Sequence, residues 1–230
     1  MSGASAPNSE SPFPGHIPGP AVKRLSLYLR ELEAHQRAGD RTVSSRRLGA
    51  ALGLTDAQVR KDLAYFGQFG QPGIGYDVPA LSERIRRILG TDRPINVVLV
   101  GAGNLGSALA AYRGFVKRGF NLVAVFDSDT RKAGQVVPGT AGVTVRPVSD
   151  IATVVQQHDV RLAILAVPAE SAQEAANRLI AAGVRGLLNF APVVLNVPET
   201  VATSAVDMAV HLEQLCFQLG VKQRGQTGGR

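Results

Sequence analysis

An apolar strand that runs directly into a glycine-rich turn constrains the fold of this 230-residue chain more than any other feature. Residues 95–100, Ile-Asn-Val-Val-Leu-Val, form a nearly continuous apolar run, typical of a strand buried on both faces of a parallel sheet. The run leads into Gly101-Ala102-Gly103-Asn104-Leu105-Gly106. In such a strand–turn–helix the first glycine permits the tight turn, the second lets a pyrophosphate approach the backbone, and the third lets the helix pack on the strand. The segment therefore predicts a Rossmann domain with a dinucleotide at residues 101–106.

An acidic residue follows the second predicted strand. That strand ends in Val125-Phe126-Asp127, which places Asp127 to accept hydrogen bonds from the hydroxyls of an adenine ribose. A carboxylate at this position would repel a 2′-phosphate, so NAD(H) is favoured over NADP(H) as the cofactor. Arg131 and Lys132 follow closely, and we interpret them as a solvated charge pair of the loop.

Strand and helix patterns alternate along the second part of the chain. Apolar runs recur at 122–126, 162–167 and 186–190, and a helical pattern spans 169–182. This alternation predicts an α/β fold with a parallel sheet and right-handed crossovers. Ligands bind at the carboxyl ends of such strands, which adds five candidates for the nicotinamide half of the cofactor site: Val167, Pro168, Asn189, Phe190 and Pro192. The alternative, that the two prolines simply end strands, stays open.

The first part of the chain carries a helix-turn-helix pattern. Helices are predicted at 20–39, with Val22, Leu25, Leu29 and Leu32 as one buried stripe, at 45–52, and at 56–66. Thr55 and Gln58 have the spacing of a capping box at the start of the third helix. Three helices with short connections, the last two of them brief, indicate a helix-turn-helix.

A glycine-rich stretch follows the third helix. Residues 66–78 hold glycines and a proline among aromatic and β-branched residues, which predicts a β-hairpin, or wing. A helix at 81–90 then connects to the Rossmann domain. The first part of the chain is therefore predicted to be a winged helix-turn-helix domain.

The net charge of +7 is concentrated in the first part of the chain and at its end. Residues 1–90 hold 12 Lys and Arg against 8 Asp and Glu, whereas residues 91–220 hold 10 of each. A basic segment beside a neutral one indicates an anionic partner such as DNA, although ordinary solubilising charge is an alternative. The hairpin favours DNA. The candidate contacts are Arg46, Arg47, Gln58, Arg60, Lys61, Tyr65 and Gln68, because Arg and Lys suit guanine edges and phosphates and Gln suits adenine.

The last predicted helix, at about 206–219, is apolar on two faces. A helix of this kind is buried on both sides, so we expect it to pack against a second subunit. The resulting division is a disordered leader at 1–19, a winged-helix domain at 20–90, a Rossmann domain at 91–204, a dimerisation helix at 205–220 and a disordered basic tail at 221–230.

The sequence contains no recognisable catalytic constellation. The four histidines have neither metal-ligand spacing nor an obvious carboxylate partner, so we expect no catalytic residue, no metal and no enzyme activity. No apolar run is long enough to cross a membrane, and the single cysteine, Cys216, fits a reducing compartment. We therefore expect a cytoplasmic protein with no membrane contact. An NAD-dependent oxidoreductase and a ligand-binding Rossmann subunit, such as a CoA-binding protein, remain alternatives to a DNA-binding sensor.

Four segments together resemble the Rex family of redox-sensing transcriptional repressors. They are residues 58–67 (QVRKDLAYFG), 73–76 (GIGY), 100–106 (VGAGNLG) and 188–195 (LNFAPVVL), within a match from about Pro20 to Gly220. The resemblance implies a homodimer with a swapped terminal helix, bound to inverted-repeat operator DNA. It also implies that NADH releases the protein from DNA and that NAD⁺ competes with NADH.

The same resemblance implies a contact that links the two domains. Arg30, Tyr112 and Asp207 stand at positions where relatives form a redox-dependent contact among an arginine, a tyrosine and an aspartate. The chain departs from the family at the wing tip, where Gln71 and Pro72 replace a residue that is basic in many relatives. Weaker wing contacts with DNA are expected from this change.

Overall fold

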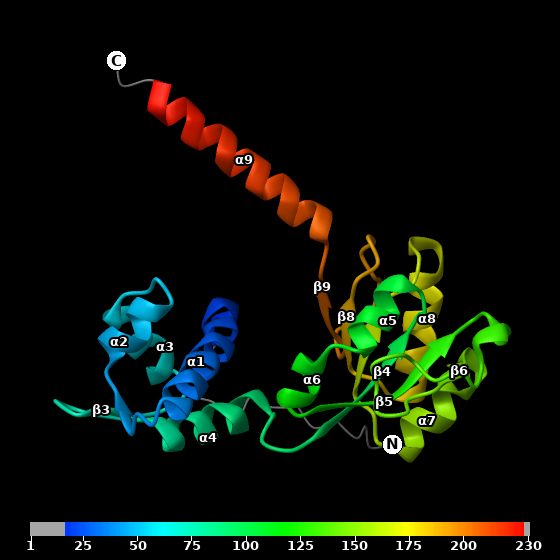
Figure 1. Ribbon diagram of the computed structural model, residues 1–230, viewed down its shortest axis with the longest axis horizontal. Helices are drawn as coiled ribbons and strands as arrows, with labels where there is room; N and C mark the ends of the chain where they lie inside the picture. Colours follow the sequence, from blue (N-terminus) through cyan, green and yellow to red (C-terminus); the bar gives the residue numbers. More distant parts are fainter. Residues whose placement is uncertain (1–16, 228–230) are drawn as a thin grey trace, which may run out of the picture. The chain divides into compact units, whose positions relative to one another are not determined.

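The computed structural model describes residues 17–227, and the chain divides into two compact units, Met1–Arg93 and Pro94–Arg230 (Figure 1). Most of the predicted leader lies outside the described residues. Its end does not match the expectation of disorder, because the first helix begins at Gly19 and Ile17 packs against the core of the first unit.

The first unit combines four helices with a small antiparallel sheet. The helices are α1 (Gly19–Arg37), α2 (Ser45–Ala51), α3 (Asp56–Ala64) and α4 (Val78–Leu89). The strands β1 (Thr42–Val43), β2 (Gly70–Gln71) and β3 (Gly75–Asp77) pair in the order β1-β3-β2. The predicted wing is the β2–β3 hairpin, and β1 is a two-residue strand that the sequence pattern did not indicate. This is the winged helix-turn-helix expected from the sequence.

Side-chain caps set where these helices begin. The Ser44 hydroxyl accepts from the Arg47 N–H, and the Thr55 hydroxyl accepts from the Gln58 N–H, each at 3.1 Å. Asp77 caps α4 through the Ala80 N–H, so α4 begins at Val78 rather than at residue 81.

Other predictions for this unit were wrong in detail. Helix α3 ends at Ala64 instead of residue 66. The capping box is only half formed, because the Gln58 side chain turns to Asp62. Val22 is 40% exposed, and Ala21 and Tyr28 are buried beside Leu25, Leu29 and Leu32 instead.

The second unit is built on a six-stranded sheet in the order β6-β5-β4-β7-β8-β9. Every neighbouring pair of strands is parallel. From β4 the chain adds β5 and then β6 toward one edge of the sheet. It then returns to the other side of β4 and adds β7, β8 and β9 toward the opposite edge, so the strand order reverses between β4 and β7. The strand bounds are Ile95–Val100 (β4), Phe120–Asp127 (β5), Val145–Pro147 (β6), Leu162–Leu165 (β7), Gly186–Asn189 (β8) and Ala202–Ala205 (β9).

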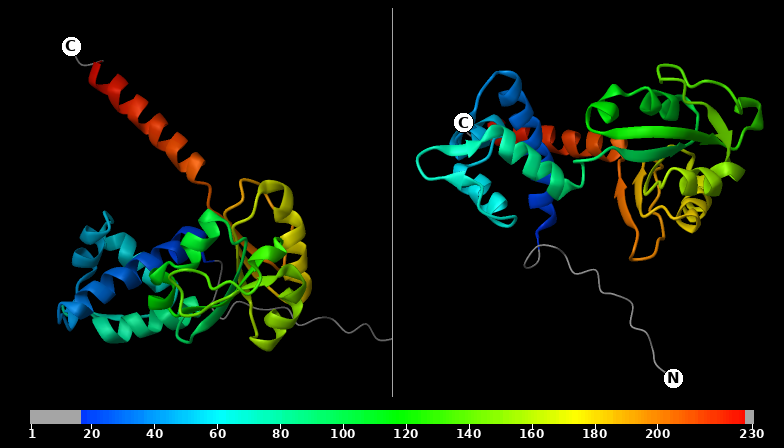
Figure 2. Two further views of the ribbon diagram at one scale, coloured as in Figure 1. Left: turned by 45° about the vertical axis from the view of Figure 1, so that its right-hand side comes forward. Right: turned by 90° about the horizontal axis from the view of Figure 1, so that it is seen from below.

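Helices cover the two faces of this sheet unequally (Figure 2). On one face, α7 (Ile151–Gln157) and α8 (Ala169–Ala182) pack against side chains of the central strands such as Val98 and Phe126. On the other face, α5 (Asn104–Ala110) and α6 (Arg113–Lys117) contribute Leu109 and Phe115 to a smaller cluster. The Rossmann architecture predicted from the sequence is confirmed, and the edge strands β6 and β9 are additions to it.

The terminal helix is longer than predicted. Helix α9 spans Met208–Thr227, so residues 221–227 are helical rather than disordered, and residues 228–230 lie outside the described part of the chain. Residue 205 belongs to β9, not to the helix. The large apolar side chains described on α9 are all exposed in the single chain: Met208, Val210, Leu212, Leu215, Phe217 and Leu219.

Candidate functional site

Steric contacts explain two of the three glycines in the turn after β4. Gly101 has φ +106°, and a Cβ there would lie 2.3 Å from the carbonyl oxygen of Ala166. A Cβ on Gly106 would lie 1.7 Å from the Gly101 carbonyl oxygen, so α5 packs directly on the end of β4. Gly103 differs, because no atom lies within 4 Å of the position of its Cβ. The fold therefore requires glycine at 101 and 106, whereas the space beside Gly103 is open.

A pocket of about 440 Å³ opens at the carboxyl ends of β4, β5 and β7, where the strand order reverses and open α/β sheets bind ligands. It brings together five of the predicted cofactor residues: Gly101, Gly103, Asp127, Val167 and Pro168. Ala102, Asn104, Leu105 and Gly106 belong to the turn and the first turns of α5 without lining the pocket. Residues that the sequence reading missed also line it: Ser128, Lys132, Val148, Ile151, Ser171, Glu174 and Arg178.

Asp127 lies in this pocket with its carboxylate already engaged. Its Oδ2 accepts from the Ala102 N–H at 2.8 Å and from Lys132 Nζ at 2.9 Å, and its Oδ1 accepts from the Asp129 N–H at 2.8 Å. Burial by itself would raise the pKa of Asp127, but the hydrogen bond from Lys132 and the two backbone donors outweigh it and hold the pKa below its usual value. The carboxylate is therefore ionised at neutral pH.

The two basic residues of the following loop have different roles. Arg131 pairs with Asp129 at the surface, with its side chain 87% exposed, as expected of a solvated loop charge. Lys132 does not fit that interpretation, because it lines the pocket and forms an ion pair with Asp127. No local pattern indicates the pair of Lys132 with Asp127, because Asp129 is nearer to Lys132 in the chain than Asp127 is.

Asn189, Phe190 and Pro192 lie at and just after the end of β8 and do not line this pocket. Asn189 is 2% exposed. Its amide nitrogen donates to the Val193 carbonyl and its amide oxygen accepts from the Ala191 N–H, each at 2.9 Å. The Phe190 N–H donates to the carbonyl of Leu165 at 2.9 Å. The Asn189 side chain therefore holds the shape of the turn that presents Phe190 and Pro192.

Most of the predicted DNA contacts are exposed on the first unit. Arg46, Arg47, Arg60, Lys61 and Gln68 are exposed, and Tyr65 is half-buried against the core. The Arg60 guanidinium lies 2.7 Å from Asp56 Oδ2 and 3.1 Å from the Ser45 hydroxyl, which connects α3 to α2. Its hydrogen bond to Asp56 holds the pKa of that carboxyl below the usual value.

A buried carboxylate ties the first helix to α3. Asp62 is 0% exposed and accepts from Arg24 Nη2 at 2.7 Å, from the Tyr28 hydroxyl at 2.6 Å and from Gln58 Nε2 at 2.7 Å. Burial would raise the pKa of Asp62, but these donors, with Arg24 foremost, lower it overall. Sequence reasoning missed Asp62. Its spacing places it on the buried stripe of α3, because it follows the buried Val59 by three residues and directly precedes the buried Leu63.

The predicted coupling residues belong to both units, with Arg30 in the first and Tyr112 and Asp207 in the second. Arg30 is exposed on α1. The Tyr112 ring is 60% exposed and meets Phe115 edge-on, with ring centroids 5.2 Å apart. Asp207 Oδ1 accepts from the N–H groups of Ala209 and Val210 at 2.9 and 3.2 Å, so Asp207 caps the start of α9.

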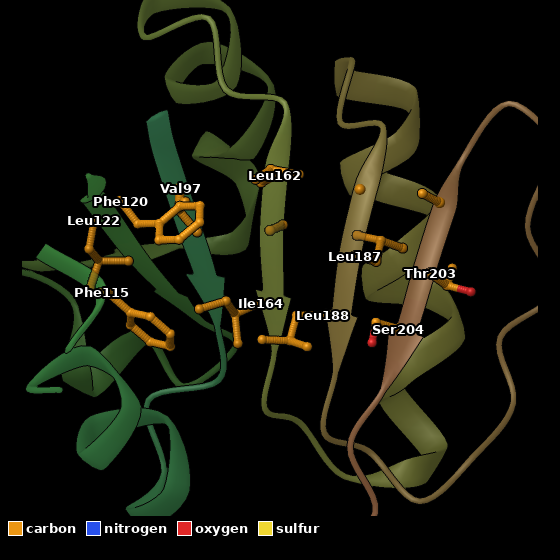
Figure 3. A pocket seen from close by; sticks show the side chains of 13 residues that line it. Val97, Phe115, Phe120, Leu122, Leu162, Ile164, Leu187, Leu188, Thr203 and Ser204 are labelled. Atoms are coloured by element: carbon orange, nitrogen blue, oxygen red, sulfur yellow. The ribbon is translucent and has the colours of Figure 1, made fainter. Parts of the chain in front are cut away.

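An apolar groove of about 340 Å³ lies on the sheet face beside α6 (Figure 3). The strand register aligns Ile164, Leu188 and Ser204 in one row across β7, β8 and β9, and Figure 3 shows these three side chains at one level. Phe115, Phe120 and Leu122 border the groove. Its lining is hydrophobic, which is unlike a site built to bind a nucleotide.

Within residues 17–227, no helix combines the length and apolar character needed to cross a bilayer. Over the same described residues, no group of three or more His, Cys, Asp or Glu side chains is arranged to hold a metal ion.

Two family descriptions match separate parts of the chain. "Putative DNA-binding protein N-terminus" matches residues 16–64, and "CoA binding domain" matches residues 92–193. Relatives match almost the whole length. The chain is 50% identical over 203 residues to the redox-sensing transcriptional repressor Rex of Carboxydothermus hydrogenoformans, covering 88% of this chain and 96% of the relative. It is 46% identical to that of Streptomyces coelicolor, covering 87% of this chain and 77% of the relative.

Solved structures give the same result. The chain resembles RSP in complex with β-NAD⁺ and operator DNA with a TM-score of 0.85 and 34% identity, covering 93% of this chain and 97% of that one. RSP in complex with β-NADH is similar, with a TM-score of 0.81, 32% identity and coverage of 93% and 99%. The first of these structures holds β-NAD⁺ and operator DNA together, and the second holds β-NADH.

Proposed function

The chain belongs to the Rex family of redox-sensing transcriptional repressors, and from this premise we propose that it occupies inverted-repeat operator DNA until NADH binds. NADH and NAD⁺ are its effectors and not its redox substrates, since its relatives are named as repressors rather than enzymes. One observation carries the proposal. The same chain holds a winged helix with an exposed basic face and a nucleotide pocket at the reversal point of a parallel sheet.

Helix α3 supplies the base contacts in this proposal. Arg60 and Lys61 are exposed on it and suit guanine edges and phosphates. Arg46 and Arg47 on α2 hold the phosphate backbone. Gln58 gives one amide hydrogen to Asp62, which leaves its oxygen and second hydrogen for an adenine edge. Tyr65 and Gln68 complete the contact surface, and the neutral wing tip adds little charge to it.

The pocket of the second unit holds the dinucleotide. The pyrophosphate lies over Gly103 at the start of α5, where backbone N–H groups face the anion. The adenine ribose meets Asp127, and the nicotinamide lies toward Val167, Pro168, Phe190 and Pro192. Asn189 holds Phe190 and Pro192 in place, because its side chain stabilises the turn that carries them.

The contact among Arg30, Tyr112 and Asp207 converts nucleotide binding into a change of DNA affinity. Reduction removes the positive charge of the nicotinamide ring, and a neighbouring tyrosine and aspartate redistribute their polar contacts in response. The exposed Tyr112 ring and the position of Asp207 at the start of α9 support this role. A 100-fold change in DNA affinity needs a coupling free energy of about 2.7 kcal/mol, which a few rearranged contacts supply.

The protein acts as a homodimer joined through α9. Two features of the single chain support this: the exposed apolar side chains of α9 and the apolar groove beside α6 (Figure 3). Each is a surface that a soluble subunit covers, and the helix of a second copy matches the groove in chemistry. Two-fold symmetry of the dimer then matches an inverted-repeat operator.

The dimer is tested by introducing one charge on α9. Leu212→Glu places a carboxylate on an apolar stripe, and we expect dissociation into monomers in analytical ultracentrifugation. Gln218→Glu adds the same charge on the same helix at a polar position between the two apolar faces and should leave the dimer intact. A dimeric Leu212→Glu protein would contradict the role of α9.

The function is tested by fluorescence anisotropy of a labelled inverted-repeat duplex, titrated with NADH and separately with NAD⁺ at fixed salt, because DNA affinity depends steeply on salt. We expect tight binding that micromolar NADH reverses and NAD⁺ does not. Tight binding indifferent to both nucleotides would remove the redox switch.

One alternative has a specific observation behind it, the CoA-binding description matched by residues 92–193. Failure to bind any duplex, together with saturable binding of CoA, would favour a ligand-binding subunit instead.

The proposed site of action of the repressor is the cytoplasm, where bacterial operators and NADH are both present.

A further inference from the structure

Lys132 stands in the nucleotide pocket where the sequence alone places only a carboxylate. Its ammonium group lies 2.9 Å from Asp127 Oδ2 and 3.4 Å from the carbonyl of Ala102. Its side chain is 34% exposed, so it is accessible from the pocket, whereas that of Asp127 is 10% exposed. The expected site of ribose recognition is therefore an ion pair.

The loop between Asp127 and Lys132 is folded so that this pair forms. Asp129 accepts from the Arg131 N–H at 3.1 Å, and its carbonyl accepts from the Lys132 N–H at 3.0 Å. These bonds close a 3-10 turn at Thr130–Lys132. The turn places Arg131 at the surface, where it forms an ion pair with Asp129, and Lys132 in the pocket, where it forms an ion pair with Asp127.

The ion pair changes both properties by which Asp127 would reject a 2′-phosphate. Its charge is balanced, so the carboxylate no longer presents a net negative potential to a second anion. Its acceptor capacity is also reduced, because Oδ2 already receives two donors and Oδ1 one. A carboxylate offers about four acceptor positions, so binding both ribose hydroxyls competes with Lys132.

We propose that Lys132 determines the nucleotide selectivity of this pocket by neutralising Asp127 and limiting its discrimination against 2′-phosphorylated nucleotides. The proposal rests on NAD(H) binding in this pocket, as proposed above. It makes the selectivity a property of the pair. Asp127 disfavours the 2′-phosphate by charge repulsion. Lys132 lies within contact distance of Asp127 and offsets this repulsion.

The test measures the dissociation constants of NADH and NADPH by their own fluorescence, at fixed salt, on the full-length protein. Lys132→Gln should raise the ratio of the NADPH to the NADH dissociation constant at least about fivefold, which is what one unit charge at contact distance produces even with water-like screening. Lys132→Arg retains the charge and should keep the wild-type ratio. Asp127→Asn leaves the cation unopposed and should lower the ratio.

The matched control is Arg131→Gln, which removes the same charge one residue earlier from a side chain that points to the surface. We expect an unchanged ratio there. In the double variant Asp127→Asn/Lys132→Gln the two effects should not add, because the residues are in contact. A change of less than fivefold in Lys132→Gln, or an equal change in Arg131→Gln, overturns the proposal. Absence of NADH binding in the wild type would refute the proposed function, and this proposal with it.

Discussion

Gly103→Ala should separate the folding role of the glycine turn from its binding role. Gly103 has φ −81° and ψ −169°, an extended conformation that alanine adopts without strain. A Cβ at this position meets no atom within 4 Å. Replacement of glycine at such a compatible position stabilises a protein by about 0.4–1 kcal/mol, because the unfolded chain loses freedom. We therefore expect the variant to be as stable as the wild type or slightly more stable.

Binding should respond in the opposite direction. The open space over Gly103 is where the pyrophosphate approaches the backbone, and a methyl group there inserts volume into a close contact. Overpacking of this kind costs about 1–3 kcal/mol, which weakens NADH binding about 5- to 150-fold. The variant should then stay on operator DNA at NADH concentrations that release the wild type.

The assay pairs urea unfolding, followed by circular dichroism, with NADH fluorescence titration. Gly106→Ala is the contrasting variant, because its Cβ would lie 1.7 Å from the Gly101 carbonyl and should lower both stability and affinity. Unchanged NADH affinity in Gly103→Ala would refute the assignment of the pyrophosphate to this turn. A clear loss of stability in Gly103→Ala would refute the steric reasoning itself.

Three further outcomes are expected. Asp62→Ala leaves Arg24 without its buried partner and should lower the free energy of unfolding by about 3 kcal/mol, measured by urea denaturation. The pKa of Asp62 is lowered in the fold, so the stability that its carboxylate contributes is complete above the unfolded-state pKa of about 3.9 and is lost as the pH falls through the folded-state pKa. Asp62→Asn should therefore flatten the curve of unfolding free energy against pH in this acidic range. An unchanged curve would contradict this reasoning. Arg60→Ala/Lys61→Ala should abolish operator binding in anisotropy while NADH still binds, and loss of both activities would indicate misfolding instead.

The sequence predicted the parts of the site that depend on neighbours along the chain. The strand, the three glycines and Asp127 after the next strand follow from the spacing of one strand–turn–helix unit. The helix starts at Ser45 and Asp56 follow the same rule, because a capping hydroxyl acts over three residues. The short edge strands β6 and β9 escaped notice because neither carries the long apolar run of a central strand.

Tertiary structure decided which charged and polar groups meet. Arg24 and Asp62 are 38 residues apart in the chain, and no local pattern distinguishes a partnered buried aspartate from a solvated one. Lys132 and Arg131 are adjacent in the sequence, yet Lys132 lies in the pocket and Arg131 lies in solvent. Hydrophobic periodicity and capping are local and can be read from residue spacing, whereas an ion pair depends on the direction in which a folded loop points each side chain.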